Sequence, residues 1–151
     1  MNRKQIARFL QQAESLCEQR GSRLTTQRKT VLELVYAADK PLSAYEILDL
    51  LRETTKNPAP PTVYRALDFL LEQGLVHKLE SQHAFIACTH PQHKHTGQFL
   101  ICDDCGEVSE IENQAIAKSL HSAERATGFK TRHPVIELVG ICADCQSQHH
   151  K

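Results

Sequence analysis

Two Cys-x-x-Cys pairs constrain this chain more than any other feature of its sequence. The first reads CDDC at residues 102–105, the second reads CADC at residues 142–145, and an apolar segment precedes each. Two thiolates from each of two tight turns make a closed tetrahedral set, the ligand arrangement of structural zinc. In a reducing compartment such pairs hold metal more often than they form disulfides. The pattern predicts one structural zinc bound by Cys102, Cys105, Cys142 and Cys145.

The segment between the two pairs is long enough to fold. We expect a strand near residues 107–112, a helix from about Asn113 to Thr127 that ends at Gly128, and a strand near residues 135–142. A half-chain of roughly 70 residues has a thin hydrophobic core. Bound zinc would therefore supply folding free energy that this half otherwise lacks.

The first half of the chain is different in composition and predicts helices. Residues 1–80 contain one Cys and one His, whereas the rest contains five Cys and eight His. Apolar residues recur at helical spacing in three stretches, of which one ends at Gly21, one begins at Thr25 or Thr26, and one follows Ser43. Ser43 is expected to form a capping box with Glu46. The predicted fold class is α+β, with one domain at 1–83, a second at 84–151 and a hinge at about 84–96.

A fourth helix, PTVYRALDFLLEQG, is expected to begin at Pro61. Its apolar residues cluster on one side, so Thr62, Tyr64 and Arg65 project from the first turn and a half. A recognition helix contacts base edges from this position, where Arg can bind guanine and Tyr can contact a thymine methyl group. From this helix alone, an ordinary solvated face remains an alternative.

Two strand-like runs, LVHKLE and HAFIAC, flank Ser81-Gln82 and predict a hairpin. Helices followed by a hairpin are typical of a winged helix. A two-residue turn places Leu75 opposite Cys88 and His77 opposite Ile86. His77 and Cys88 then become diagonal neighbours on one face, close enough to bind one ion.

Other potential ligands for a second metal are numerous, and the residues leave the choice open. The Cys88–His95 run is the most compact source. The full set of candidates is His77, His83, Cys88, His90, His93, His95, Glu107, Glu110, Glu112, His121 and His133.

Charge and hydropathy give weaker indications. The formal net charge is zero, but the first 30 residues carry 7 Lys and Arg against 2 Asp and Glu, which favours approach of a polyanion at that end. We expect no signal peptide and no membrane span, and hence a cytoplasmic protein.

Several motifs together resemble the ferric-uptake-regulator family, and within it the zinc-uptake regulators. They are LTTQR, PPTVYRALDFLLEQGLVHK, and the pairing of CDDCG with CADC. The resemblance implies a winged-helix domain hinged to an α/β dimerisation domain. It also implies a homodimeric, zinc-responsive repressor, without enzymatic activity or a small-molecule substrate, that binds a pseudo-palindromic operator in double-stranded DNA upstream of zinc-uptake genes.

The resemblance also implies residue roles, with two Zn²⁺ per protomer. Tyr64 and Arg65 match base-contacting residues, and the four paired cysteines match structural zinc ligands. The regulatory zinc ligands that the resemblance implies are His77, Cys88, His95 and Glu110. His90 or His93 remain alternatives to His95. Where iron-type members carry HHDH before the first Cys pair, this chain has TGQFLI, so His133 lacks partners and is left unassigned.

One thiolate, two imidazoles and one carboxylate suit zinc better than iron(II) or manganese. An iron or peroxide sensor of the same family remains the alternative. From other classes, a zinc storage or delivery protein and a zinc hydrolase remain, although HExxH and PCxxC catalytic motifs are absent from the sequence.

Overall fold

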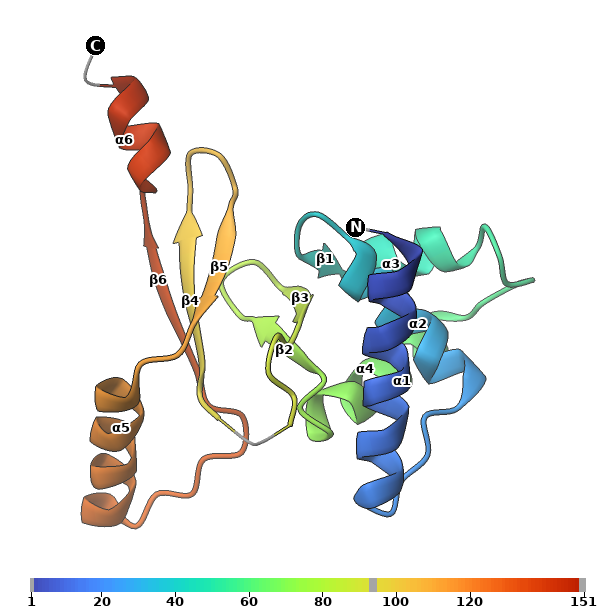
Figure 1. The fold of residues 1–151 in the computed structure, drawn as a ribbon, viewed down its shortest axis with the longest axis horizontal. Helices are drawn as coiled ribbons and strands as arrows, with labels where there is room; N and C mark the ends of the chain where they lie inside the picture. The colour runs from blue at the N-terminus through green and yellow to red at the C-terminus, as the bar shows by residue number, and fades with distance from the viewer. Residues whose placement is uncertain (1, 93–94, 150–151) are drawn as a thin grey trace. The chain divides into compact units, whose positions relative to one another are not determined.

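The computed structural model describes residues 2–92 and 95–149, and it divides the chain into two compact units, Met1–His93 and Lys94–Lys151 (Figure 1). The division falls inside the expected hinge at 84–96 but later than the expected domain boundary after residue 83. The reason is that strand β3 (Ala84–Ala87) pairs with two other strands of the first unit. The backbone hydrogen bonds of β3 are made within the first unit, so the strand belongs to that unit.

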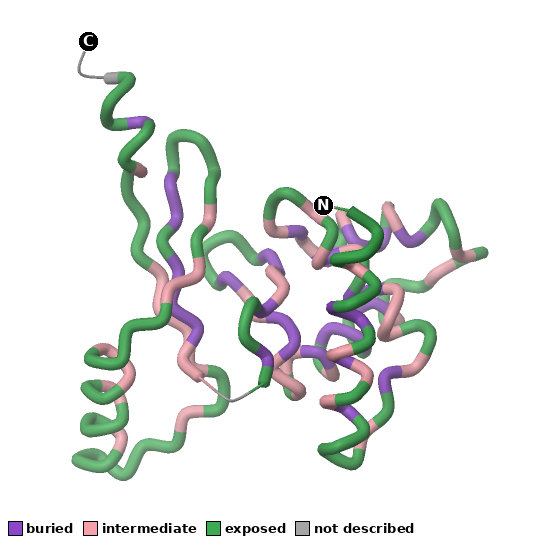
Figure 2. The backbone as a smooth tube through the Cα atoms, in the orientation of Figure 1, coloured by how far each residue is buried: buried purple, intermediate pink, exposed green. Residues whose placement is uncertain are grey.

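Four helices form the core of the first unit. They are α1 (Arg3–Gln19), α2 (Thr26–Ala37), α3 (Ala44–Leu51) and α4 (Pro60–Glu72). Each has one apolar face, and these faces meet in a continuous buried cluster. Buried positions recur along the helices of this unit (Figure 2). Its fully buried side chains include Cys17, Val31, Leu32, Ile47, Leu51, Val63, Leu67 and Leu70.

The ends of these helices follow local chemistry. Thr25 caps α2 by accepting a hydrogen bond from the Arg28 N–H. The predicted capping box of α3 is confirmed, because Ser43 and Glu46 each accept the other's backbone N–H at 3.1 Å. The predicted start of α4 was wrong by one residue. Pro60, rather than Pro61, occupies the first helical position, and two prolines fit there because neither position needs its N–H.

A small antiparallel sheet follows α4, in the order β1-β3-β2, where β1 is Leu42–Ser43 and β2 is Val76–Leu79. The predicted register is confirmed, with His77 opposite Ile86. Pairing ends at Leu79 and Ala84, so the turn is longer than the predicted two residues. Strand β1 was not predicted, because two residues are too few to show a periodic pattern.

The second unit is built on a three-stranded mixed sheet in the order β5-β4-β6. Central strand β4 (Gly97–Cys102) pairs antiparallel with β5 (Val108–Ile111) and parallel with β6 (Val135–Gly140). The parallel register sets Cys102 beside Gly140. Both Cys-x-x-Cys pairs therefore start at the same end of the sheet.

Two helices complete the second unit, α5 (Gln114–Thr127) and the short α6 (Ala143–His149). The start of α5 is fixed by reciprocal hydrogen bonds between the buried Gln98 side chain and the backbone of Asn113. As predicted, Gly128 ends the helix, with a φ of 71°. No residue of α5 is buried, so its apolar face packs little against its own unit (Figure 2).

Within the part of the chain that the structure describes, no helix combines the length and the apolar character needed to cross a membrane.

We predict that Ser43→Ala lowers the free energy of unfolding by about 1 kcal/mol, because the N–H of Glu46 loses its acceptor. The Ser43 backbone N–H also lowers the pKa of Glu46 by hydrogen bonding to its carboxylate. A carboxyl group whose pKa is lower in the folded protein stabilises the fold at pH values above its unfolded-state pKa. This contribution to the free energy of unfolding is lost as the pH falls through the folded-state pKa. Urea unfolding measures the effect, with the exposed Ser147→Ala as a control of less than about 0.5 kcal/mol.

Candidate functional site

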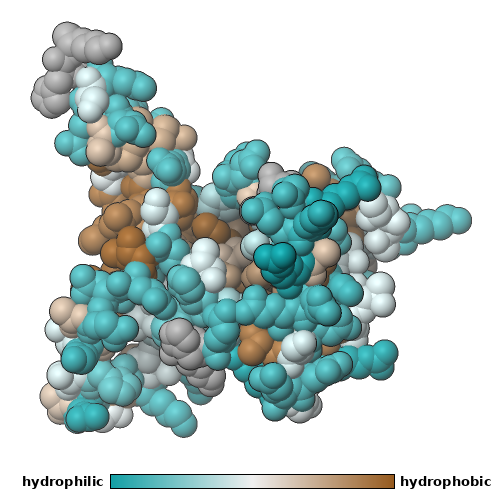
Figure 3. Space-filling model, in the orientation of Figure 1, coloured by the Kyte–Doolittle hydropathy of each residue, from teal (hydrophilic) through white to brown (hydrophobic). Residues whose placement is uncertain are grey.

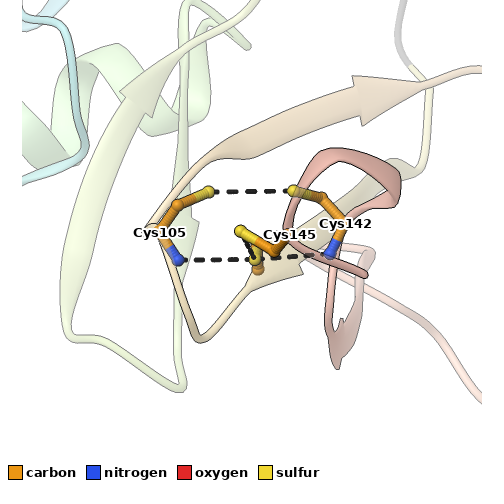
Figure 4. A group of neighbouring side chains, drawn as sticks. Cys105, Cys142 and Cys145 are labelled. Carbon is orange, nitrogen blue, oxygen red and sulfur yellow. Dashed lines mark hydrogen bonds between the residues drawn. The ribbon is translucent and has the colours of Figure 1, made fainter. Parts of the chain in front are cut away.

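The four paired cysteines meet at one end of the sheet in the second unit. Cys102 ends β4, Cys105 lies in the turn that follows, and Cys142 and Cys145 come from the junction of β6 with α6. The Sγ atoms of Cys102 and Cys145 are 3.8 Å apart, and those of Cys105 and Cys142 are also 3.8 Å apart (Figure 4). All four sulfur atoms lie within 4.8 Å of one another.

These distances fit a tetrahedral zinc ion. With Zn–S bonds of about 2.3 Å, a regular tetrahedron separates its sulfur atoms by about 3.8 Å. A disulfide needs sulfur atoms only about 2.05 Å apart, so the cluster is not arranged for pairwise oxidation. Four thiolates occupy every position around the ion, which leaves none for a reacting water molecule.

The electrostatics of the cluster also favour a cation. Backbone N–H groups of Cys105 and Cys142 donate to the Cys102 sulfur at 3.5 and 3.3 Å. These hydrogen bonds lower the pKa of Cys102 to about 6. The neighbouring Cys142 side chain, together with burial, raises the pKa of Cys145. A cation is therefore needed before all four sulfur atoms can ionise together.

Two of the four ligands expected for the second metal lie in the first unit. His77 is in β2, and Cys88 directly follows β3. The Cys88 N–H donates to the Leu75 carbonyl at 2.9 Å, which extends the hairpin register by one pair. Cys88 is fully buried, and the register places it diagonal to His77 on one face of the hairpin. The hairpin thus presents a thiol and an imidazole side by side.

The other two expected ligands lie in the second unit. His95 precedes β4 and Glu110 is in β5. The His95 Nε2 and Glu110 Oε1 atoms are 3.0 Å apart, and the two side chains are only 13% and 3% exposed. A carboxylate this buried requires a compensating partner, either a protonated imidazole or a cation.

The remaining histidine candidates do not join these groups. His83 and His90 are exposed on the first unit, and His121 and His133 are exposed on the second. His93 lies outside the described residues, so its candidacy as an alternative to His95 stays a prediction.

A third set of candidates lies at the start of α4. Tyr64 is 49% exposed and Arg65 is exposed, while Val63, Ala66 and Leu67 on the same turns are buried. Thr62 and Arg65 line a shallow hollow, whose other wall is the first turn of α2 with Thr25, Gln27 and Arg28. The first turns of α2 and α4 thus border one hollow, and each helix contributes an arginine to it.

Sequence reasoning missed Arg28. Its guanidinium lies 3.8 Å from the centre of the Phe69 ring, and it donates to the Arg23 carbonyl at 2.8 Å. Stacking on an aromatic ring holds a planar guanidinium in one orientation. The available signal was an Arg three residues after a capping Thr in LTTQR, which places the side chain on the first turn of a helix.

We predict that Cys102→Ser abolishes tight zinc binding by the cluster and unfolds the second unit, because three thiolates cannot close the tetrahedron. Zinc content and circular dichroism measure the two effects. Cys17→Ala is the matched control, since Cys17 is buried in the core of the first unit. A Cys102→Ser protein with wild-type zinc content and helicity would refute a structural role for the cluster.

Comparison with known proteins places these features in a family. The Escherichia coli zinc uptake regulation protein is 49% identical over 138 residues, which cover 91% of this chain and 81% of the relative. A solved structure of a zinc uptake regulator complexed with zinc and DNA is 46% identical, with a TM-score of 0.88 over 97% of this chain and 98% of that one. The crystal structure of holo XcZur is also 46% identical, with a TM-score of 0.82 over 92% of this chain and 97% of that one.

The sequence profile of the ferric uptake regulator family matches residues 19–139, which include the helix with Tyr64 and Arg65 and the first Cys pair. The match spans most of both units. The chain belongs to the ferric uptake regulator family.

Proposed function

We propose that this protein is a zinc-responsive transcriptional repressor that binds operator DNA as a homodimer and controls zinc-uptake genes from the cytoplasm. The observation that carries the proposal is a juxtaposition within the first unit. The hairpin with His77 and Cys88 directly follows the helix that exposes Tyr64 and Arg65. A metal bound by this hairpin would act on the unit that reads DNA.

The start of α4 suits the major groove of DNA. Buried residues fix one face of the helix, which leaves Tyr64 and Arg65 free to reach base edges. Arg28 supplies a second guanidinium beside the same hollow. One arginine can then bind guanine while the other contacts phosphate, the two kinds of contact that DNA readers combine.

The second zinc in this proposal is held by both ligand pairs. His77 and Cys88 supply two ligands from the first unit, and His95 and Glu110 supply two from the second. Each pair alone leaves a tetrahedral ion half coordinated. An ion that needs both pairs favours one arrangement of the units over all others, which is how metal binding would change affinity for DNA.

Zinc fits this ligand set better than iron. Iron(II) favours more oxygen and nitrogen ligands, whereas a buried thiol such as Cys88 favours a softer ion. We therefore place zinc sensing ahead of iron or peroxide sensing. Metal content after purification from defined medium separates these alternatives.

A zinc hydrolase or a zinc storage protein is supported less well. The four-cysteine cluster has no open coordination position for a reacting water. A storage protein has no need for an exposed Tyr64 and Arg65 at the start of a helix whose first two positions are prolines. DNA repression accounts for both features together.

The proposed homodimer rests on apolar surface in the second unit. Leu100 and Leu138 are register partners on β4 and β6 and are 42% and 55% exposed, with Val139 and Ile141 exposed nearby (Figure 3). Helix α5 adds its unburied apolar face. Each is exposed apolar surface of the kind that a second copy covers. A symmetric dimer presents two α4 helices, which accounts for a pseudo-palindromic operator.

We predict that Arg65→Ala weakens binding to the operator by about 1–3 kcal/mol and weakens binding to random DNA less. The operator is a double-stranded fragment selected in vitro from random DNA by the zinc-loaded protein. Fluorescence anisotropy measures both affinities, and sedimentation checks that the dimer is unchanged. Arg125→Ala on α5 is the control and should alter neither affinity. Equal losses on the two DNAs would mean that Arg65 contacts only phosphate.

We predict that Cys88→Ser leaves a folded dimer that keeps its four-cysteine zinc but loses zinc-dependent operator binding at limiting, buffered zinc. A coupling of about 3 kcal/mol corresponds to roughly 150-fold in affinity, which titration readily measures. His95→Ala should behave in the same way, and the exposed His90→Ala should be nearly neutral. Wild-type zinc dependence in both Cys88→Ser and His95→Ala would exclude this sensing site.

A further inference from the structure

Arg20 connects two segments of the first unit that lie far apart in the sequence. Its guanidinium donates one hydrogen bond to the Gln73 carbonyl, and a second, of 2.9 Å, to the Pro91 carbonyl. Gln73 is the C-terminal cap of α4. Pro91 lies in the segment between Cys88 and His95. One side chain thus holds the end of the helix proposed to read DNA and the segment between two proposed zinc ligands.

The backbone of Arg20 is well fixed for this role. Arg20 caps α1, and its N–H donates to the carbonyls of Leu16 and Cys17 at 3.1 Å. Cys17 is fully buried, and its carbonyl also accepts the N–H and the hydroxyl of Ser22. The guanidinium therefore extends from a helix end that is anchored in the core.

The two acceptors are informative because of what adjoins each of them. Beyond Gln73, only Gly74 and Leu75 separate α4 from strand β2, which carries His77. Pro91 is buried, and it follows Cys88 by three residues and precedes His95 by four. A zinc ion that binds Cys88 would hold the chain three residues from the Pro91 carbonyl.

We infer that Arg20 is a positioning residue that transmits zinc binding to the recognition helix, an inference that rests on the proposed function. A planar guanidinium donates in fixed directions, so its two acceptors hold a set separation when both are bound. Zinc fixes the segment around Pro91, and Arg20 relates that segment to the C-terminal end of α4. Because both acceptors are backbone carbonyls, Arg20 is the side chain whose replacement breaks this connection.

Arg20→Met tests the inference in the full-length protein. It keeps the length and apolar stem of the side chain but donates no hydrogen bond. The measured quantity is the zinc response, the ratio of operator affinities at high and at limiting buffered Zn²⁺. We expect Arg20→Met to reduce this ratio about five- to tenfold, with the four-cysteine zinc and the dimer retained. Arg20→Lys should be intermediate, because an ammonium group keeps the charge but lacks the planar fork.

Arg8→Met is the matched control, since Arg8 is an exposed arginine on the same helix. It can change DNA affinity through its charge, but it should leave the zinc response unchanged. A second readout uses reciprocity, because operator DNA must tighten zinc binding by the factor by which zinc tightens DNA binding. We expect Arg20→Met to reduce both factors equally.

The outcomes separate this inference from the proposed function. An absent zinc response in the wild type would refute the proposed function, whatever Arg20 does. A wild-type response together with an unchanged ratio in Arg20→Met, even at a lower melting temperature, would make Arg20 merely structural and overturn the inference. If Arg20→Met does not fold, an unchanged ratio in Arg20→Lys overturns it.

Discussion

The convergence of four cysteine sulfur atoms at one end of the sheet is the constraint on which the second unit depends, because a cation bound there would join its segments. Few of its described side chains are buried, and Cys102 and Cys145 are themselves two of them, beside Phe99 and Ile101. Helix α5 buries no residue. The hydrophobic contribution of this unit alone is therefore small, and ligand bonds to a cation at the four cysteines would supply what the core lacks.

The first unit has a different source of stability, and the contrast suits a sensor. Its four helices share one continuous apolar core, so hydrophobic burial is its main source of stability. A protein whose DNA-binding unit is stabilised by an apolar core can vary the occupancy of a weaker metal site without unfolding that unit. In the proposed arrangement, zinc concentration changes how the two units are oriented, and both units stay folded.

The features that sequence predicted correctly are those set by local chemistry or strict periodicity. The capping box at Ser43, the left-handed Gly128 and the register of His77 with Ile86 each follow from a few neighbouring residues. The four-cysteine cluster was also predictable, because metal-ligand spacing is a strong long-range constraint.

The errors came from features that depend on tertiary context. Strand β1 has two residues and exists because β3 offers it an edge. The hydrogen bonds from Arg20 to two backbone carbonyls have no sequence signature, because such an acceptor can belong to any residue. Arg28 was overlooked for a related reason, since its orientation depends on Phe69 from another helix.

The parallel pairing of β4 with β6 has a consequence for the order of events during synthesis. Cys102 and Cys145 are 43 residues apart in the chain, so the first Cys pair is synthesised and emerges before its partner pair. At about 5–20 residues per second, that interval lasts on the order of several seconds. The helices of the first unit are complete by then, whereas the nascent thiols of Cys102 and Cys105 remain open to oxidants and to competing metals. A site that needs all four sulfur atoms can therefore form only after Cys145 has been made.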